Sequence, residues 1–360
     1  MSRGTRAVID LSALQHNFRR VKTFAPQSQV LAVVKADGYG SGAVQVARAL
    51  ADADGFGVAT FAEAVTLREA GIAQLILLME GVLDPCELQQ AAEQRFEVVI
   101  HQDWQLDMLL DTTIAAPLVV WLKVDTGMHR LGLPPQRVLA VWETLRNSAK
   151  VSDLRLMSHL ACADEVDHPL NVSQREEFAA LVKSTGARTC SFANSAGIVR
   201  GESFHYQWVR PGIMLYGATP VNEASAAELN LKPVMQLESS VIAKSVVLAG
   251  QTVGYGATWT AEKDTPVAVV AIGYGDGYPR HVSKDAFVLI GGQRCPLVGR
   301  VSMDMLTVDI SAMPDAPINA PVILWGNGLP VEQVARWAGT INYELLCQVT
   351  DRVQRVYRAH

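Results

Sequence analysis

The sequence has no apolar run that approaches the ~20 residues needed to span a bilayer, so we expect no membrane partner. Its first residues include basic side chains, but no apolar segment follows them, and we expect no secretory signal peptide. The five cysteines are an odd number, are scattered and form no C-x-x-C pair, which argues against a disulfide framework and a zinc–thiolate site. These absences are typical of a protein of the reducing cytoplasm, where we expect this chain to act.

The sequence also lacks a strong excess of either charge. Lys and Arg number 31 and Asp and Glu number 36, which gives a formal net charge of −5. Nucleic-acid-binding proteins need a basic face, so we expect no nucleic-acid partner. Apolar residues, in contrast, are plentiful. They make up 49% of the 360 residues, enough for the core of one large domain or two ordinary ones.

Short apolar runs alternate with segments of helical period through the first two-thirds of the chain. The expected strands are Gln29–Ala36, Phe56–Thr60, Leu75–Met79, Glu97–His101, Leu118–Val124, Leu154–Leu160, Thr189–Ala193 and Trp208–Tyr216. The expected helices between them include Gly42–Ala51, Ala62–Ala70, Pro85–Gln94, Pro135–Arg146 and Gln174–Ser184. Wholly apolar strands are typical of parallel sheets covered on both faces. Eight repeats favour a closed (β/α)8 barrel over a doubly wound open sheet.

The pattern changes near Pro233, where period-2 runs broken by Gly and Pro begin. Such runs predict antiparallel strands with tight turns, interrupted by one helix at Val331–Ala338. The predicted fold class is therefore α/β, with an N-terminal (β/α)8 barrel over residues 1–232. A C-terminal, mostly antiparallel β domain is expected over residues 233–360.

A lysine ends the first expected strand, in the run VVKADGYGSG. Active sites of barrels lie at the C-terminal ends of the strands. Lys35 at such an end can extend out of the barrel mouth or pair with Asp37. It can equally be desolvated and ready to form a Schiff base. The position alone leaves both interpretations open, and the glycines that follow suggest a close approach of backbone to a ligand.

The seventh expected strand is followed by the run NSAG, and the eighth expected strand contains the run RPGI. Barrels commonly bind phosphate at these two loops, and Ser195 with the N–H groups of Gly212 and Ile213 suits that role. The alternative to phosphate binding is that the NSAG residues only form a turn and cap a helix. Arg210 needs a partner, because a guanidinium inside an apolar strand is otherwise costly.

Further titratable groups follow other strands at the same rim. Lys123 and Arg130 flank the fifth strand end and His159 follows the sixth. Together with the two basic residues already named, they indicate an anionic ligand. A metal site at His159 and His168 is not expected, because the loop does not place the two rings on one face. Three tyrosines beside turns complete the candidates: Tyr255, Tyr274 and Tyr343.

The chain resembles the pyridoxal-phosphate-dependent alanine racemases along essentially its whole length. The motifs that carry the resemblance are VVKADGYG, KVDTGMHRLG, MSHLACADE, NSAG, WVRPGIMLYG, VGYGATW, IGYGDGYPR, GRVSMDML and INYEL, in that order. The run at the lysine departs from the K-A-N-A-Y-G-H-G common in the family at Asp37, Gly38 and Ser41, and Ser302 stands where some members have Cys. The family's fold is a barrel followed by a β domain, in agreement with the pattern above.

The resemblance implies a role for each matched position. Lys35 is similar to the lysine that holds the cofactor as a Schiff base and acts as a base on one face of the substrate Cα. Tyr255 is similar to the base on the opposite face, which the other subunit contributes. Arg210 resembles the partner of the pyridine nitrogen, and His159 would bond to Tyr255 or Arg210. Positive charge from Arg210 or a protonated His159 would favour the tyrosinate.

The remaining matches concern the cofactor phosphate and the substrate. The resemblance assigns the cofactor cradle to Tyr39, Asn194, Ser195, Gly212, Ile213 and Tyr343. It assigns substrate contacts to Arg130, Met303 and Tyr274, the last two from the partner subunit. Lys123 matches a lysine that is carbamylated in many members.

The activity that the resemblance implies is interconversion of L-alanine and D-alanine by a homodimer with shared sites, supplying D-alanine for peptidoglycan. Serine and other small amino acids stay open as substrates, because one hydroxyl group is worth only roughly 1–3 kcal/mol of specificity. A cofactor-carrying single-domain barrel is disfavoured by the C-terminal β domain. A decarboxylase of the same architecture would need a different acid at Tyr255, and a phosphosugar enzyme would not need Lys35 with Arg210.

Overall fold

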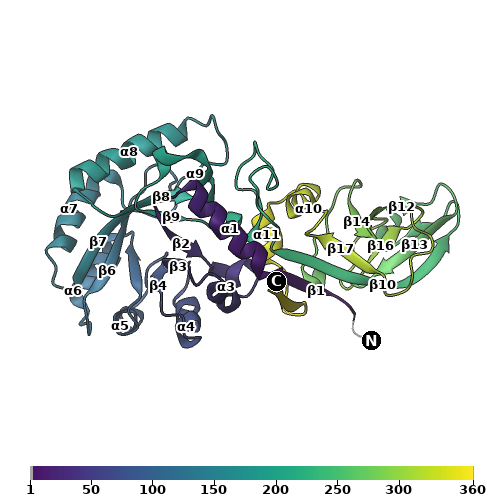
Figure 1. Cartoon of the computed structure of the whole chain (residues 1–360), viewed down its shortest axis with the longest axis horizontal. Helices are drawn as coiled ribbons and strands as arrows, with labels where there is room; N and C mark the ends of the chain where they lie inside the picture. Colours follow the sequence, from purple (N-terminus) through teal and green to yellow (C-terminus); the bar gives the residue numbers. More distant parts are fainter. Residues whose placement is uncertain (1–2, 360) are drawn as a thin grey trace.

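The computed structural model describes residues 3–359, so the outermost ends of both expected domains, residues 1–2 and 360, lie outside the described residues. The chain forms two parts, a barrel and a separate sheet, joined end to end (Figure 1). The barrel is closed and all its strand pairs are parallel. Its strands are β2 (Gln29–Val33), β3 (Gly55–Val58), β4 (Leu75–Leu78), β5 (Glu97–Ile100), β6 (Leu118–Lys123), β7 (Val151–Met157), β8 (Cys190–Asn194) and β9 (Trp208–Arg210). The predicted eight-stranded barrel is confirmed.

Helices cover the outside of the barrel (Figure 1). They are α1 (Leu11–Phe24), α3 (Ala43–Ala49), α4 (Phe61–Glu69), α5 (Pro85–Glu93), α6 (Asp103–Asp111), α7 (Pro135–Arg146), α8 (Leu170–Thr185) and α9 (Ser195–Arg200). Side chains cap the starts of several of them, among them α1 and α4. The Asp10 carboxylate accepts the N–H of Ala13 at 2.8 Å, and Thr60 with Glu63 forms a capping box at α4.

The barrel interior is filled, so it is not a channel. Its core is an apolar layer made of Leu31, Leu77, Val99, Trp121, Met157 and Trp208. At the N-terminal end of the strands, the Glu97 carboxylate accepts the indole N–H of Trp121 at 2.6 Å and pairs with Arg155 at 3.1 Å. These contacts fill the interior near this end of the strands, and the active sites of such barrels lie at the opposite, C-terminal rim.

The last predicted barrel strand is shorter than the expected Trp208–Tyr216. The strand β9 stops at Arg210, and a 3₁₀ helix, η2 (Ile213–Tyr216), follows. Pro211 has no N–H to continue the ladder, and the backbone turns at Gly212. The break places the start of η2 at the C-terminal end of β9, at the rim of the barrel.

The second part is a sheet in which all pairs but one are antiparallel, as the sequence predicts. Its main elements are β10 (Met235–Val247), β13 (Thr265–Val270), β14 (Phe287–Ile290), β15 (Gln293–Pro296), β16 (Leu306–Asp309), β17 (Pro321–Trp325) and β18 (Gln354–Arg358). A small hairpin, β11 (Thr252–Val253) with β12 (Trp259–Thr260), and the helices α10 (Val331–Ala338) and α11 (Asn342–Cys347) complete it.

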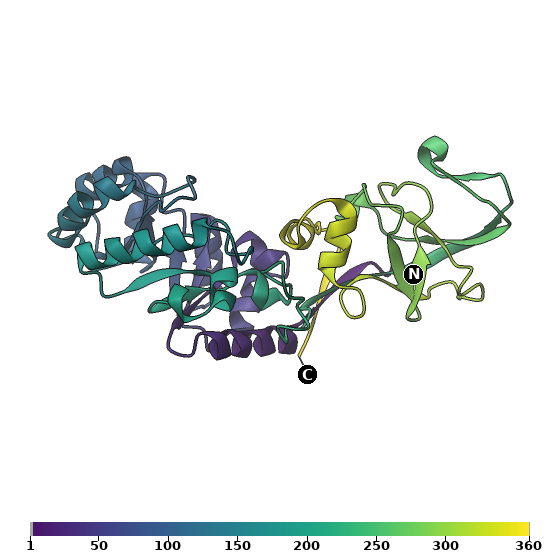
Figure 2. The same ribbon diagram turned by 90° about the horizontal axis from the view of Figure 1, so that it is seen from above.

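The sheet also takes in the beginning of the chain, which the sequence analysis placed with the barrel. The strand β1 (Arg6–Asp10) pairs antiparallel with β10 and parallel with β18. Five residues directly before a helix carry too little periodicity to reveal a strand. The two parts are therefore tied by three strands at their junction, visible from above in Figure 2. Among residues 3–359, no helix combines the length and the apolar character needed to cross a membrane.

Candidate active site

A cavity of about 610 Å³ lies at the C-terminal rim of the barrel, where α11 of the second part approaches it. Sequence-predicted residues form most of its wall: Lys35, Tyr39, Lys123, Arg130, His159, Asn194, Ser195, Arg210, Gly212, Ile213 and Tyr343. They come from the last residues of β6, β8 and β9, from the segments that follow β2, β6, β7, β8 and β9, and from α11. The parallel strands bring these distant positions together, because all their C-terminal ends meet at one rim.

Lys35 opens a tight turn, α2 (Lys35–Tyr39), whose backbone is left-handed. The φ angles are 51° at Ala36, 51° at Asp37, 61° at Gly38 and 52° at Tyr39. A left-handed conformation costs a residue with a Cβ roughly 1–2 kcal/mol, so surrounding contacts must hold this turn. Such strain is typical of functional sites.

The Asp37 carboxylate does not pair with Lys35. It accepts the N–H of Ala43 at 2.8 Å and so satisfies the start of α3. Within the described chain the Lys35 amine has no ion pair or hydrogen bond, and it faces the cavity. Pairing with Asp37 is therefore excluded, and the Lys35 amine is available to a ligand in the cavity.

Arg210 is 2% exposed, and only the two terminal nitrogens of its guanidinium have hydrogen-bond partners among the described residues. Nη1 donates to the Ser191 hydroxyl at 2.5 Å, and Nη2 donates to the carbonyl of Ser158 at 2.6 Å. Burial lowers the pKa of Arg210 to about 10, so the group stays charged at neutral pH. The buried Nε–H has no partner among residues 3–359. Buried donors normally have an acceptor, so this Nε–H fits a ligand that carries an acceptor atom into the cavity.

His159 is neutral in this setting. Its Nδ1 accepts a hydrogen bond from Arg210 Nη2 at 3.3 Å. Burial, and then the charge of Arg210, hold the pKa of His159 well below its usual range. The proton of the ring therefore sits on Nε2. Of the two expected sources of positive charge beside a tyrosinate, only Arg210 fits, and a protonated His159 does not.

The loops after β8 and β9 form a cradle suited to a phosphate. The Ser195 hydroxyl accepts the N–H of Gly212 at 2.8 Å, which brings α9 and η2 together. A Cβ on Gly212 would clash with the Tyr39 hydroxyl, so only glycine leaves this space open. Burial raises the pKa of Tyr39, and it raises the pKa of Tyr343 to about 12. Both phenols therefore stay protonated and can donate to phosphate oxygens.

Lys123 ends β6 and is 7% exposed. Burial lowers its pKa to about 8, and the neighbouring charges of Arg210 and Arg130 act in the same direction. Glu80, at the end of β4, opposes them. The sequence analysis missed Glu80, because it collected only basic groups at the rim. A charged residue directly after the apolar run LILLM was the available signal.

The residues present fit pyridoxal phosphate. Its aldehyde matches the free amine of Lys35, and its pyridine nitrogen is an acceptor for the unpartnered Nε–H of Arg210. Its phosphate matches the cradle around Ser195 and Gly212. Two of these three groups, the Lys35 amine and the Arg210 Nε–H, have no partner among residues 3–359 and would gain one from this molecule.

Three predicted residues do not line this cavity: Tyr255, Tyr274 and Met303. Their exposed fractions are 71%, 39% and 52%. Tyr274 and Met303 lie on adjacent loops, since the N–H of Tyr274 donates to the Ser302 carbonyl at 3.1 Å and that of Gly275 to the Met303 carbonyl at 2.8 Å. Tyr255 lies between the two strands of the small hairpin, β11 and β12. The strand β12 lies in the half of the second part that is farther from the barrel (Figure 1).

Comparison with known proteins identifies the family of this chain. A profile of the alanine racemase N-terminal domain matches residues 9–220, and a profile of the alanine racemase C-terminal domain matches residues 234–357. The chain belongs to the alanine racemase family. Membership makes it an enzyme of the isomerase class and confirms the resemblance drawn from the motifs.

Individual relatives agree with the family assignment over nearly the full chain. Alanine racemase from Nitrosococcus oceani is 49% identical over 351 residues, which are 97% of this chain and 98% of that protein. A crystal structure of biosynthetic alanine racemase from Pseudomonas aeruginosa superposes with a TM-score of 0.97 at 47% identity, covering 99% of this chain and 100% of that one. A crystal structure of alanine racemase from Bartonella henselae with covalently bound pyridoxal phosphate is 30% identical, with a TM-score of 0.88 and 99% coverage of both chains.

Proposed function

We propose that this chain interconverts L-alanine and D-alanine with pyridoxal phosphate bound through Lys35. The observation that carries the proposal is the pair of unsatisfied groups in one cavity, the free Lys35 amine and the orphaned Nε–H of Arg210. The names of the relatives and the covalently bound pyridoxal phosphate of the Bartonella henselae enzyme support it. The activity would supply D-alanine for peptidoglycan in the cytoplasm.

The chemistry needs an electron sink and a base on each face of the substrate Cα. Bound pyridoxal phosphate would supply the sink that makes the α-proton of an amino acid removable. Lys35 Nζ takes or returns this proton on one face. Arg210 would donate its Nε–H to the ring nitrogen of the bound cofactor and, unlike a carboxylic acid, would not transfer its proton, because a guanidinium stays protonated at neutral pH. A ring without this proton would be a weaker electron sink, which would limit side reactions.

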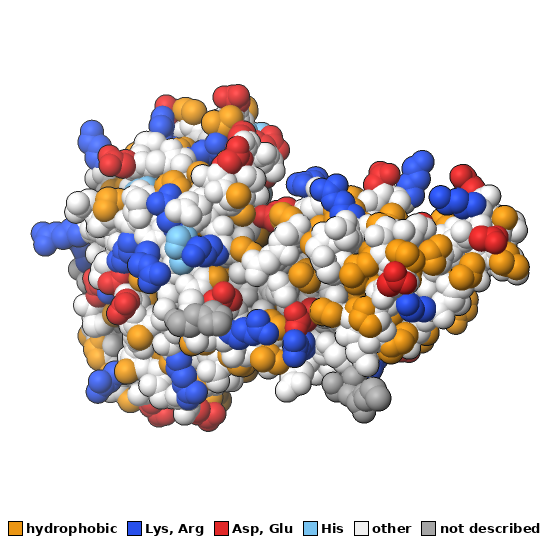
Figure 3. Space-filling model, turned by 45° about the vertical axis from the view of Figure 1, so that its right-hand side comes forward, with side chains coloured by type: hydrophobic (Ala, Val, Ile, Leu, Met, Phe, Trp, Pro, Cys, Tyr) orange, Lys and Arg blue, Asp and Glu red, His pale blue; other side chains and the backbone are white. Residues whose placement is uncertain are grey.

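The second base is Tyr255 of another copy of this chain. Tyr255 lies outside the cavity of its own chain and exposes 71% of its surface, which is unusual for an aromatic residue without a partner. Ile242 and Val246 on β10 and Leu248 directly after it are also exposed, and the face in Figure 3 carries many hydrophobic side chains over the second part. An interface here would cover them. The enzyme is therefore a homodimer with shared sites.

His159 is placed to form a hydrogen bond with this tyrosine. It is neutral, so its Nε2–H can donate to the Tyr255 oxygen of the other copy while Nδ1 accepts from Arg210. The Arg210 charge, relayed through this hydrogen bond, favours the tyrosinate that acts as a base. Tyr274 and Met303 of the same copy would border the substrate entrance, and Arg130 would contact the substrate carboxylate.

A direct assay tests the proposed function. The protein, loaded with pyridoxal phosphate, is expected to convert L-alanine into D-alanine, detected by coupling to a D-amino-acid oxidase. The reverse reaction from D-alanine is expected to reach the same equal mixture of enantiomers. Release of CO2 from alanine, or the absence of D-alanine with bound cofactor present, would contradict the proposal.

Lys123 is expected to carry a carbamate. Its pKa of about 8 leaves a substantial neutral fraction, and only the neutral amine attacks CO2, forming an N–C bond and releasing one proton. The product turns a buried positive charge into a negative one that Arg130 and Arg210 offset. The carbamate signal in ¹³C NMR with labelled bicarbonate is expected to grow from about pH 6.5 to 8.5. A Lys123→Arg variant should lack it, and an equal signal in that variant would refute the assignment.

A further inference from the structure

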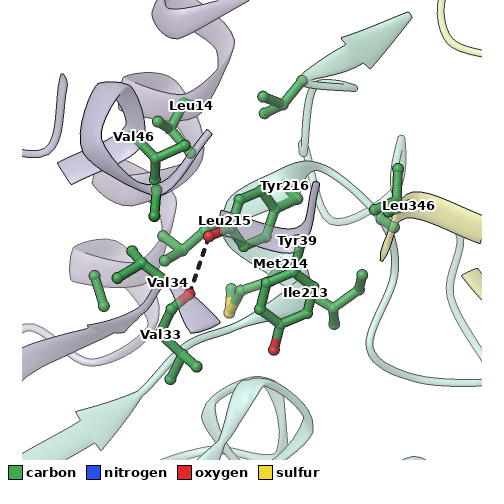
Figure 4. Packing of buried hydrophobic residues seen from close by; sticks show 14 of the residues in the cluster. Leu14, Val33, Val34, Tyr39, Val46, Ile213, Met214, Leu215, Tyr216 and Leu346 are labelled. Carbon is green, nitrogen blue, oxygen red and sulfur yellow. Dashed lines mark hydrogen bonds between the residues drawn. The ribbon is translucent and has the colours of Figure 1, made fainter. Parts of the chain in front are cut away.

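Tyr216 is not among the residues that line the cavity, and its side chain lies between Val33 and Tyr39, which flank Lys35 in the sequence (Figure 4). Its hydroxyl donates to the Val33 carbonyl at 3.0 Å, two residues before Lys35. Its ring stacks on Tyr39, four residues after Lys35, with centroids 4.5 Å apart and planes 24° apart. Tyr216 is 2% exposed, so these contacts are shielded from water.

Tyr216 also belongs to η2, the 3₁₀ helix whose start forms part of the phosphate cradle. Tyr216 ends the 3₁₀ helix η2, which begins at Ile213 directly after Gly212. A second bond runs alongside, because the N–H of Val33 donates to the Pro211 carbonyl at 2.9 Å. The end of β2 is thus joined to the segment after β9 twice, once by backbone and once by the Tyr216 side chain.

We propose that Tyr216 is a positioning residue that holds the Lys35 turn in register with the phosphate cradle. A ligand whose aldehyde and phosphate lie a fixed distance apart needs the amine and the cradle at a matching distance. The left-handed backbone of Ala36–Tyr39 is energetically costly, since three of its four residues have a Cβ, so contacts from outside the turn add to the hydrogen bonds within it. Tyr216 contacts Val33 before this turn and Tyr39 at its end, and it connects the turn to the phosphate cradle because it belongs to η2. The proposal rests on the assignment of the cavity to pyridoxal phosphate.

The hydroxyl of Tyr216 suits this role chemically. Burial raises its pKa well above the ordinary value, so the phenol stays protonated and remains a donor across the working pH range. The Val33 carbonyl is buried, and without the hydroxyl it would lose this partner. Phenylalanine at this position would keep the ring, the stacking on Tyr39 and almost all of the volume. The Tyr216→Phe variant therefore removes the hydrogen bond and little else.

Tyr278 provides a matched control. It is 1% exposed, lies in the second part of the chain and stacks on Trp325, with centroids 6.3 Å apart. Its hydroxyl has no hydrogen-bond partner in the part of the chain that the structure describes. A Tyr278→Phe variant thus removes a buried phenol oxygen without breaking a contact to the Lys35 turn.

Two measurements test the proposal. In the cofactor-free protein, hydrogen exchange of the amides of Gly38 and Gly40, both bonded within the turn, is expected to be at least about threefold faster in Tyr216→Phe than in the wild type. The dissociation constant of pyridoxal phosphate, from absorbance titration of the same protein, is expected to rise about two- to tenfold. Tyr278→Phe should match the wild type in both.

The possible results distinguish three cases: Tyr216 positions the Lys35 turn, Tyr216 only packs in the core, or the protein does not bind pyridoxal phosphate. If Tyr216→Phe lowers the unfolding temperature equally with and without cofactor, while turn exchange and cofactor affinity stay at wild-type values, Tyr216 only packs and the proposal is wrong. If the wild type itself takes up no pyridoxal phosphate, the proposed function fails. The exchange experiment on the cofactor-free protein then still decides whether Tyr216 holds the turn.

Discussion

A Lys35→Ala variant is expected to lose both covalent cofactor and racemase activity. Alanine has no amine to bond to the aldehyde and no base for the proton on that face of Cα. A general base alone contributes about 10²–10⁴-fold, so we expect racemisation to fall by at least about 10³-fold. Visible absorbance after gel filtration and mass after borohydride reduction measure the bound cofactor, and the reduced wild type should gain the mass of the cofactor.

A Lys35→Arg variant is the control for charge. It keeps a cation in the cavity and should still attract the phosphate of the cofactor, but a guanidinium does not form the covalent bond under these conditions. Reducible, covalently bound cofactor in either variant would show that another amine holds it, and the assignment of Lys35 would be wrong.

Tyr255→Phe is expected to slow proton transfer on one face of the substrate far more than on the other. The phenol oxygen is the base for one enantiomer only, whereas the ring keeps the shape of the pocket. Exchange of the α-hydrogen with solvent deuterium should therefore fall about 10²–10⁴-fold for one enantiomer and much less for the other. Proton NMR of each enantiomer in deuterium oxide measures the two rates separately.

A Tyr206→Phe variant controls for the loss of a phenol elsewhere. Tyr206 packs against Phe178 and Phe192 near the start of β9, at the opposite end of the barrel strand from the cavity. Its exchange rates for both enantiomers should equal those of the wild type. An equal loss for both enantiomers in Tyr255→Phe would argue against one base per face.

The barrel and most of its rim could be predicted from the sequence for a simple reason. Parallel strands buried on both faces are almost wholly apolar, so the first charged residue after each run marks the rim. Lys35, Lys123 and Arg210 all stand at such positions. Their meeting in one cavity follows from closure of the barrel alone.

Other features depend on contacts that no local pattern records. The left-handed turn after Lys35 contains alanine, aspartate and tyrosine, which do not favour that backbone, and it is held by Tyr216, about 180 residues away along the chain. Strand β1 is defined by its partners β10 and β18 rather than by its own five residues. The distance of Tyr255 from its own cavity likewise emerges only from the fold, although the family resemblance anticipated it.

Mixed dimers of Lys35→Ala and Tyr255→Phe chains test most directly whether the site is shared between two copies. Each variant alone should be almost inactive. A mixed dimer would contain one site with neither group and one site with both, because Lys35 and Tyr255 of a site come from different chains. Random pairing of equal amounts should restore about a quarter of wild-type activity, since half of the dimers are mixed and each has one intact site of two. Mixed dimers that form but remain as inactive as the parent variants would contradict the account, because that is the result expected if both groups act within one chain.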